Sequence, residues 1–256
     1  MEHIHHLIGG KNSPSTSGRT GPVFNPATGL QTAQVDFASV EEIDAAIASA
    51  SAAFPEWRAT SVAARVKLMF KYRELVDRNS AEIARVISSE HGKTEADAAG
   101  EVARGLENIE YACGVAETMA GRFTEQASTG IDVFDIRQPL GVVAGITPFN
   151  FPAMVPLWML PNAVAAGNTF ILKPSEKDPS APQLLVELFH EAGFPPGVLN
   201  LVHGDKVAVD RLLTHPDIKA VSFVGSTPVA RHVHETATAN GKRVQALAGA
   251  KNHMIV

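Results

Sequence analysis

The stretch TFILKPSEKDPSAPQLLVELFHEAGFPPGVLNLV, residues 169–202, decides the predicted fold. It begins with the apolar run TFILK, passes through a polar turn into a longer amphipathic segment, and ends in a second apolar run, VLNLV. A short apolar run without alternation is typical of a strand buried on both faces of a parallel sheet. The segment between two such strands forms a crossover helix, so residues 169–202 predict one βαβ unit.

The same alternation of strand and helix continues on both sides of this unit. Upstream, IDVFDIRQPLGVVAGITP predicts two strands around a Pro-Leu-Gly turn. The further predictions are helices over 154–166, 181–192, 206–213 and 227–237, and strands over 198–202, 220–225 and 242–247. Parallel strands with right-handed crossovers place helices on both faces. The predicted fold class is therefore α/β, with a Rossmann-type doubly wound parallel sheet.

The N-terminal part of the chain has a different character. Its first forty residues are rich in Gly, Pro, Ser and Thr and predict edge strands and turns, with NPATG as one turn. A helix is predicted from the N-cap Ser39, and longer helices over 61–88 and 94–119. We therefore divide the chain into an N-terminal segment, 1–138, and a doubly wound core, 139–256.

Composition excludes several classes of function. The 256 residues carry a net charge of −5 and no basic run, so neither nucleic acid nor an anionic membrane is an expected partner. Prolines and asparagines interrupt the uncharged run 151–172, which predicts a buried helix, a turn and a strand rather than a membrane span. A single cysteine and no apolar leader favour the cytoplasm.

The histidines His3, His5 and His6 raise the question of a metal. Their spacing matches neither a helical pair four residues apart nor a zinc motif, and no acidic or cysteine partner is close in the sequence. We therefore assign no metal ligand.

Ligands of open parallel sheets bind beyond the carboxyl ends of the strands. Four polar loops follow predicted strands: TPFNFP after 146, KPSEKDP after 172, HGDK after 202 and GSTP after 224. In the last loop, Gly225 lets a ligand approach the backbone, Ser226 supplies a hydroxyl, and Thr227 is the expected N-cap of a helix whose free N–H groups attract phosphate. The G-x-G-x-x-G fingerprint is absent, so a merely capped helix is the alternative.

Two further loops allow a functional and a structural interpretation. The Glu176 carboxylate can accept hydrogen bonds from both hydroxyls of an adenosine ribose and repel a 2′-phosphate, which favours NAD over NADP, although Lys177 weakens the preference. Otherwise this is a solvated turn whose Asp178 caps the next helix. Asn150, between two aromatic residues and two prolines, is either an amide donor to an oxyanion or a tie within its own loop.

In this order and spacing, TPFNFP, AGNTFILKPSE and FVGS resemble the aldehyde dehydrogenase superfamily. The stretch PFNFPAMVPLWMLPNAVAAGNTFILKPSEKDP and the closing GAKNH resemble its CoA-acylating branch, which acts on methylmalonate and malonate semialdehydes. The resemblance covers essentially the whole chain, from HHLIGGK onward. It implies an aldehyde dehydrogenase-like fold, a homotetramer, and a role for part of segment 1–138 in oligomerisation.

The resemblance also implies roles for individual residues. Asn150 becomes the oxyanion donor, and Arg104 one of two arginines that hold the substrate carboxylate. The alternative for Arg104 is pairing with Glu101 and Glu107 on its own helix. The implied NAD contacts are Thr147, Pro148, Phe149, Lys173, Ser175, Glu176, Lys177, Gly225, Ser226 and Ala248.

In this family a cysteine thiolate attacks the aldehyde, hydride passes to NAD, and the thioester is released to water or to coenzyme A. That cysteine is expected beyond Val256, so we expect the chain to end before the catalytic domain and to be inactive by itself. Cys113 has no neighbour that lowers its pKa and is interpreted as a small core residue.

Hydrolytic relatives carry a glutamate in an ELGGK strand end, where this sequence has ALAGAK, residues 246–251. Loss of that base favours coenzyme A over water as the acceptor. The implied reaction is the NAD-dependent, CoA-acylating oxidation of methylmalonate or malonate semialdehyde to propionyl-CoA or acetyl-CoA, as in valine breakdown. A hydrolytic aldehyde dehydrogenase and a non-catalytic nucleotide-binding fragment are the alternatives.

Overall fold

The computed structural model describes residues 2–249, 254 and 255. Its elements, in chain order, are β1 (Glu2–Ile4), β2 (His6–Ile8), β3 (Lys11–Ser13), β4 (Thr20–Asn25), β5 (Leu30–Asp36), α1 (Val40–Ala59), α2 (Val62–Arg78), α3 (Ser80–His91), α4 (Glu95–Cys113), α5 (Val115–Met119), β6 (Phe123–Ser128), β7 (Ile131–Phe134), β8 (Val142–Ile146), α6 (Met154–Ala165), β9 (Thr169–Lys173), α7 (Ser180–Glu191), β10 (Leu199–Leu201), α8 (Lys206–Thr214), β11 (Ile218–Val224), α9 (Thr227–Ala239) and β12 (Arg243–Leu247).

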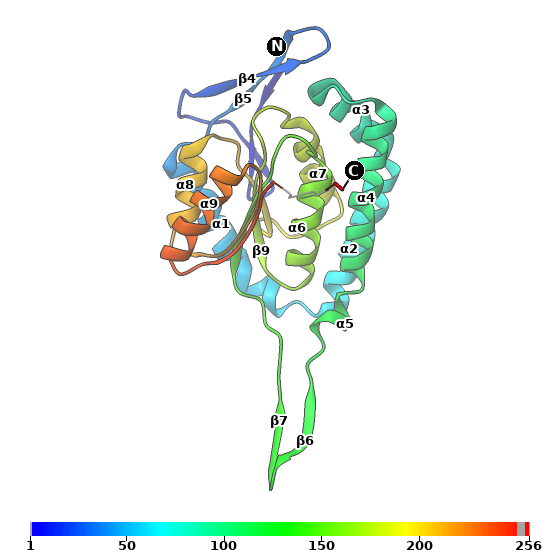
Figure 1. Ribbon diagram of the computed structural model, residues 1–256, viewed down its shortest axis with the longest axis vertical. Helices are drawn as coiled ribbons and strands as arrows, with labels where there is room; N and C mark the ends of the chain where they lie inside the picture. Colours follow the sequence, from blue (N-terminus) through cyan, green and yellow to red (C-terminus); the bar gives the residue numbers. More distant parts are fainter. Residues whose placement is uncertain (1, 250–253, 256) are drawn as a thin grey trace.

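The main sheet confirms the doubly wound prediction, with helices on both of its faces (Figure 1). Its strand order is β12-β11-β8-β9-β10-β2-β3, and the five strands from β12 to β10 are parallel. From the central β8 the chain runs through α6 and α7 to β9 and β10 on one side. It then returns through α8 and α9 to β11 and β12 on the other. The order reverses between β8 and β11, and this switch point is where such sheets bind ligands.

Helices on both faces bury the middle of this sheet. On β8, Val143 packs into a core with α2, α4, α6 and α7, whereas Val142 and Ala144 pack into a second core with α1, α8 and α9. β9 divides in the same way, with Phe170 in the first core and Ile171 in the second. The prediction that every strand is buried on both faces was wrong for β12, however. Its residues alternate between exposed and partly buried.

The uncharged run 151–172 forms α6, a turn and β9, as predicted. α6 is only twelve residues long and contains Pro161. Among residues 2–249, 254 and 255, no helix has both the length and the apolar character needed to cross a membrane.

The N-terminal segment forms a small sheet and a layer of helices. β4 and β5 form a hairpin around the predicted NPATG turn, and β1 adds parallel to β5. The predicted cap of α1 is confirmed. The Glu42 amide donates to Ser39 Oγ at 3.2 Å, and the Ser39 amide donates to the Glu42 carboxylate at 2.8 Å. β2 then pairs antiparallel with β10, so segments 1–138 and 139–256 share one sheet, and the division between them remains a prediction.

Two predictions for the helical layer were wrong in detail, and one strand after this layer was not predicted. The helix predicted over 61–88 is two helices, α2 and α3, separated by Asn79. The helix predicted over 94–119 breaks at Gly114 into α4 and α5. The strand β6 was missed; it pairs with β7 in a hairpin that projects away from the rest of the molecule (Figure 1).

Candidate nucleotide-binding site

A cavity of about 640 Å³ lies at the carboxyl ends of β8, β9 and β11. It is bounded by the loops that follow these strands and by the first turns of α8 and α9. The structure brings nine predicted residues together in its lining: Thr147, Pro148, Phe149, Lys173, Ser175, Glu176, Lys177, Gly225 and Ser226. Asn150, Arg104 and Ala248 lie outside the lining.

A buried ammonium group lies at the end of β9. Lys173 is 5% exposed, and its Nζ donates to Glu176 Oε2 at 3.2 Å. Burial lowers the pKa of the Lys173 ammonium, against the opposing effect of the Glu176 carboxylate. The pair directs one ammonium and one carboxylate into the same cavity, which suits ligands that carry hydroxyl groups.

The loop after β8 is held against the loop after β9. The Thr147 amide donates to the Lys173 carbonyl at 3.1 Å, and the Lys177 ammonium lies 4.4 Å from the centre of the Phe149 ring. The other buried group here is the Thr147 hydroxyl, which lacks a hydrogen-bond partner within the described part of the chain. Because an unpaired buried hydroxyl is costly, this oxygen is suited to contact a polar ligand.

α9 begins at Thr227, as predicted, but its N-cap differs from the prediction by one residue. Its N-cap is Ser226, not Thr227, and the Ser226 side chain makes no capping hydrogen bond to the helix. The hydroxyl and the first N–H groups of α9 therefore both face the cavity end of the helix, a favourable place for an anion. Gly225 has a packing reason as well, because a Cβ there would lie 2.4 Å from the Phe223 ring, which also lines the cavity.

Sequence analysis missed the side of the cavity that is formed by α8 and by the first turns of α9. The HGDK loop was predicted to meet a ligand, but none of its residues was assigned a role. Asp205 caps α8 through the Val207 amide at 3.1 Å and forms an ion pair with Arg19. The other unassigned lining residues are Ile146, Lys206, Val209, Asp210, Phe223, Val224, Pro228, Val229 and His232.

Asn150 lies next to the cavity, and its loop is tied down by other groups. Lys93 Nζ donates to the Asn150 carbonyl at 2.9 Å and to Glu101 Oε2 at 2.7 Å. The Asn150 side-chain amide, in contrast, has no partner among the described residues. The amide therefore does not tie down its own loop, and it is free to bind a ligand.

Glu101 is fully buried and caps α6. Its Oε1 accepts the amides of Ala153 at 2.8 Å and Met154 at 3.0 Å. It therefore does not pair with Arg104, and that alternative was wrong. The Arg104 guanidinium lies 5.5 Å from the centre of the Phe151 ring, beside the Asn150 loop, and its side chain is exposed.

The structural interpretation of this loop expected Asp178 to cap α7, but Asp178 does not do so. The N-cap is Pro179, and the Ser180 amide and hydroxyl both donate to Glu90. Asp178 is buried, and neither carboxylate oxygen has a partner elsewhere among the described residues. Burial, which is the largest effect, raises the pKa of Asp178 to about 9, and the nearby carboxylates of Glu90 and Glu101 act in the same direction.

Two remaining predictions concern Ala248 and Cys113. Ala248 is exposed directly after β12, and the next residue, Gly249, lies close to Thr227 at the start of α9. Residues 250–253, which include most of GAKNH, lie outside the described residues.

Burial raises the pKa of the Cys113 thiol, which is unfavourable for a nucleophile and agrees with its interpretation as a packing residue.

Comparison with known proteins identifies the family. The family model described as "Aldehyde dehydrogenase family" matches residues 13–256. The chain belongs to the aldehyde dehydrogenase family. Among curated relatives of this aldehyde dehydrogenase chain, the malonate-semialdehyde dehydrogenase of Pseudomonas aeruginosa is 55% identical over 256 residues, which are all of this chain and 51% of that protein.

Solved aldehyde dehydrogenase structures have the same fold. A Sinorhizobium meliloti protein described as a methylmalonate-semialdehyde dehydrogenase, solved in complex with NAD, matches with a TM-score of 0.96 and 54% identity. The methylmalonate-semialdehyde dehydrogenase of Oceanimonas doudoroffii matches with a TM-score of 0.96 and 53% identity. Each match covers 99% of this chain and 52% of the solved chain. The chain thus spans about half the length of the relatives it matches.

Proposed function

We propose that the protein to which this chain belongs oxidises malonate or methylmalonate semialdehyde with NAD. It then transfers the acyl group to coenzyme A, giving acetyl-CoA or propionyl-CoA with loss of CO2. The observation that carries the proposal is the 55% identity over the whole chain to a malonate-semialdehyde dehydrogenase, supported by the NAD complex of a relative 54% identical. This chain contributes the cofactor-binding half of the site.

The residues that line the cavity suit NAD. Glu176 and Lys173 would hold the ribose hydroxyls, Ser226 and the start of α9 the pyrophosphate, and Thr147, Pro148 and Phe149 the rest of the nucleotide. Ser175, Lys177 and Gly225 complete this contact surface. When bound, NAD supplies the hydride acceptor. The unpaired Thr147 hydroxyl and the buried Lys173 ammonium are groups that gain partners from such a ligand.

Two residues outside the cavity would act on the substrate. Asn150 donates its side-chain N–H to the oxygen of the aldehyde as negative charge develops there. Arg104, on the exposed side of α4 next to Phe151, binds the substrate carboxylate in a bidentate pair. Among the described residues, the Asn150 side-chain amide has no partner, and Arg104 forms no ion pair and donates only from Nε to the Gly100 carbonyl at 3.2 Å.

Coenzyme A is the proposed acceptor because ALAGAK has no acid where hydrolytic relatives have glutamate. Water needs a general base to attack a thioester, whereas a thiolate does not. In this proposal the nucleophilic cysteine lies in the rest of the protein. We place the enzyme in the cytoplasm as a homotetramer that serves pathways such as valine breakdown, with the hairpin β6–β7 in the contact between subunits.

The deciding experiment measures NAD reduction by the complete protein with malonate semialdehyde, with and without coenzyme A. We expect acetyl-CoA as the product, identified by mass spectrometry, and a fall in turnover of at least about a hundredfold without coenzyme A. A free carboxylic acid formed at an undiminished rate would show a hydrolytic enzyme instead. No NAD reduction under any of these conditions would favour a protein that only binds the nucleotide.

A further inference from the structure

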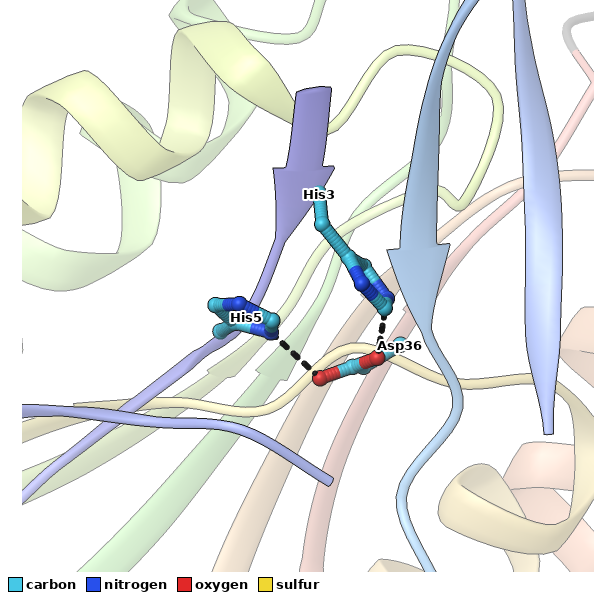
Figure 2. A group of neighbouring side chains, drawn as sticks. All are labelled: His3, His5 and Asp36. Atoms are coloured by element: carbon cyan, nitrogen blue, oxygen red, sulfur yellow. Dashed lines mark hydrogen bonds and ion pairs between the residues drawn. The ribbon is translucent and has the colours of Figure 1, made fainter. Parts of the chain in front are cut away.

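Three side chains at the N-terminal edge of the molecule converge, as Figure 2 shows. His3 Nε2 lies 2.7 Å from Asp36 Oδ1, and His5 Nδ1 lies 2.8 Å from Asp36 Oδ2. The three potential ligand atoms all lie within 4.8 Å of one another. Asp36 is thus the acidic partner that was not found near the histidines in the sequence, because it is supplied by a strand some thirty residues away.

The topology explains why these residues meet. β1 runs parallel to β5 with His3 opposite Gln34, so Asp36, the last residue of β5, lies just beyond it. His5 follows β1 at the point where the chain leaves the small sheet and enters β2 of the main sheet. The cluster therefore lies at the junction of the two sheets.

A backbone hydrogen bond holds the Asp36 carboxylate in place. The Ser15 amide donates to Asp36 Oδ2 at 2.7 Å, and the Asp36 side chain is only 3% exposed. Hydrogen bonds of this kind orient a metal-binding carboxylate. The His3 side chain, in contrast, is 42% exposed, so the cluster is open to solvent on one side.

The surface next to the cluster is acidic. His3 and His5 line a groove of about 470 Å³ together with Glu2, Glu82 and Glu187. Such a wall raises the local concentration of cations. None of these residues lines the nucleotide cavity, so the two sites are separate.

We propose that His3, His5 and Asp36 bind a divalent cation of the zinc class. Two imidazole nitrogens and one carboxylate oxygen form a ligand set that zinc and neighbouring late transition metals prefer, with water in the open positions. The bound ion connects β1, β5 and the entry to β2, so its effect is to hold the N-terminal strands against the main sheet. This site is additional to the proposed function and independent of it.

The test uses the complete protein, prepared without a polyhistidine tag and stripped with a chelator. Zinc chloride is titrated calorimetrically into the wild type, His3→Ala, His5→Ala and the double variant, and melting temperatures are measured with and without zinc. His234→Ala is the matched control, because His234 is an exposed histidine on α9. Circular dichroism establishes that each variant is folded; His3 is exposed enough for its removal to be tolerated.

We expect one zinc ion per chain whose affinity falls at least about tenfold in each single variant and is unchanged in His234→Ala. Zinc should raise the melting temperature of the wild type and the control but not of the double variant. Any zinc bound elsewhere, such as at a thiolate, binds equally to all variants, so it does not affect the difference in binding between the wild type and the variants. Equal binding by the wild type and the double variant, or no binding by either, would overturn the proposal and leave an ordinary His–Asp hydrogen-bonded cluster.

Discussion

Glu176 is the residue on which cofactor choice depends in the proposed site. Its carboxylate lies at the cavity beside the Lys173 ammonium. A carboxylate binds ribose hydroxyls strongly and repels a 2′-phosphate. Glu176→Gln should therefore raise the KM for NAD by about tenfold and reduce the ratio of kcat/KM for NAD to kcat/KM for NADP. Steady-state kinetics with both nucleotides measure this, with the exposed Glu56→Gln as control. An unchanged preference would mean that Glu176 does not contact the ribose.

Arg104 carries the proposed specificity for a carboxylate. Removing a bidentate partner costs at least about tenfold in binding, so Arg104→Met should raise the KM for malonate semialdehyde by that factor or more. The KM for propanal, which has no carboxylate, should stay the same. Arg85→Met is the control, because within the described part of the chain Arg85 pairs with Glu82 alone, on the surface of α3. Equal effects on both aldehydes would instead point to a role in holding the Phe151 loop.

Asp178 makes stability depend on pH. Its pKa is about 9 in the folded protein and 3.8 without the fold, so the folded state retains the proton over this window. The favourable contribution is therefore complete below about pH 4 and is lost as pH rises toward 9. Glu90 and Glu101 are the charged neighbours that strengthen the shift, and Lys93 opposes it.

Asp178→Asn, a neutral mimic of the protonated acid, should flatten this dependence. Between pH 5 and 8 the difference in unfolding free energy between the variant and the wild type should change by up to about 1.4 kcal/mol per pH unit, in favour of the variant. Urea denaturation at several pH values gives this difference. Asp217→Asn, at an exposed aspartate, should track the wild type. Parallel curves for Asp178→Asn would show that Asp178 is ionised in the folded protein.

Among the elements, α6 depends on a side chain from another helix for its start. Glu101 of α4 accepts two N–H groups of α6, and Lys93 connects Glu101 to the Asn150 carbonyl. Because Glu101→Ala leaves the two α6 donors without an acceptor and a mostly buried ammonium without its carboxylate partner, it should lower the unfolding free energy by about 3–5 kcal/mol. Chemical denaturation measures the loss, and Glu95→Ala, at an exposed acid in the same helix, is the control.

Lys93→Met separates the capping of α6 from the support of the Asn150 loop, although it also breaks the buried ion pair with Glu101. It removes the tie to Asn150 but leaves both α6 amides bound to Glu101. We expect kcat to fall more than the KM for NAD changes, because Asn150, not the nucleotide cavity, loses its support. A change confined to the KM for NAD would contradict this role for Lys93.

The elements that sequence analysis predicted well are those whose burial pattern is local. β9, α7 and β11 lie within two residues of their predicted bounds, because each is an apolar run or an amphipathic segment between turn residues. β6 was missed because FTEQAS has no apolar–polar alternation, whereas β7, which is equally exposed, has alternating IDVF and was predicted. The break at Asn79 was missed because the apolar periodicity continues across it.

The same distinction applies to the site. Residues at the ends of predicted strands, such as Lys173 and Ser226, could be predicted because parallel strands end at a common edge. Contacts between distant segments could not, and these include the hydrogen bond from the Ala153 amide to Glu101 and the pairing of His5 with Asp36. Only the folded chain shows which side chains these elements bring together.

At the scale of the whole molecule, one surface is less covered than the rest. Arg243, Gln245 and Leu247 of β12 are exposed on one face, next to Ala220 and Ser222 of β11. In the middle of the sheet, both faces are buried by helices. In the complete protein proposed above, this part of the sheet is the surface that further residues would cover, since the relatives are about twice as long as this chain.

The hairpin β6–β7 needs a partner even more clearly. A two-stranded hairpin is at best marginally stable in water, and every residue of both strands is exposed. Its apolar side chains include Phe123 at 65%, Phe134 at 71% and, just beyond β7, Ile136 at 67% exposure. Exposed strand edges with apolar side chains pair with other strands, and in the proposed homotetramer a second subunit provides them.

The double substitution Phe134→Asp with Ile136→Asp should therefore dissociate the complete protein into smaller species, because it introduces charge where subunits meet. Sedimentation velocity at several protein concentrations measures the change, and the far-UV circular dichroism of the core should be retained because the hairpin contributes nothing to either main core. Phe70→Asp is the matched control, since Phe70 is an aromatic residue of α2 that is 58% exposed. If the double variant sediments as the wild type does, the hairpin is not an interface, and its exposed apolar side chains must be covered by the rest of the same chain.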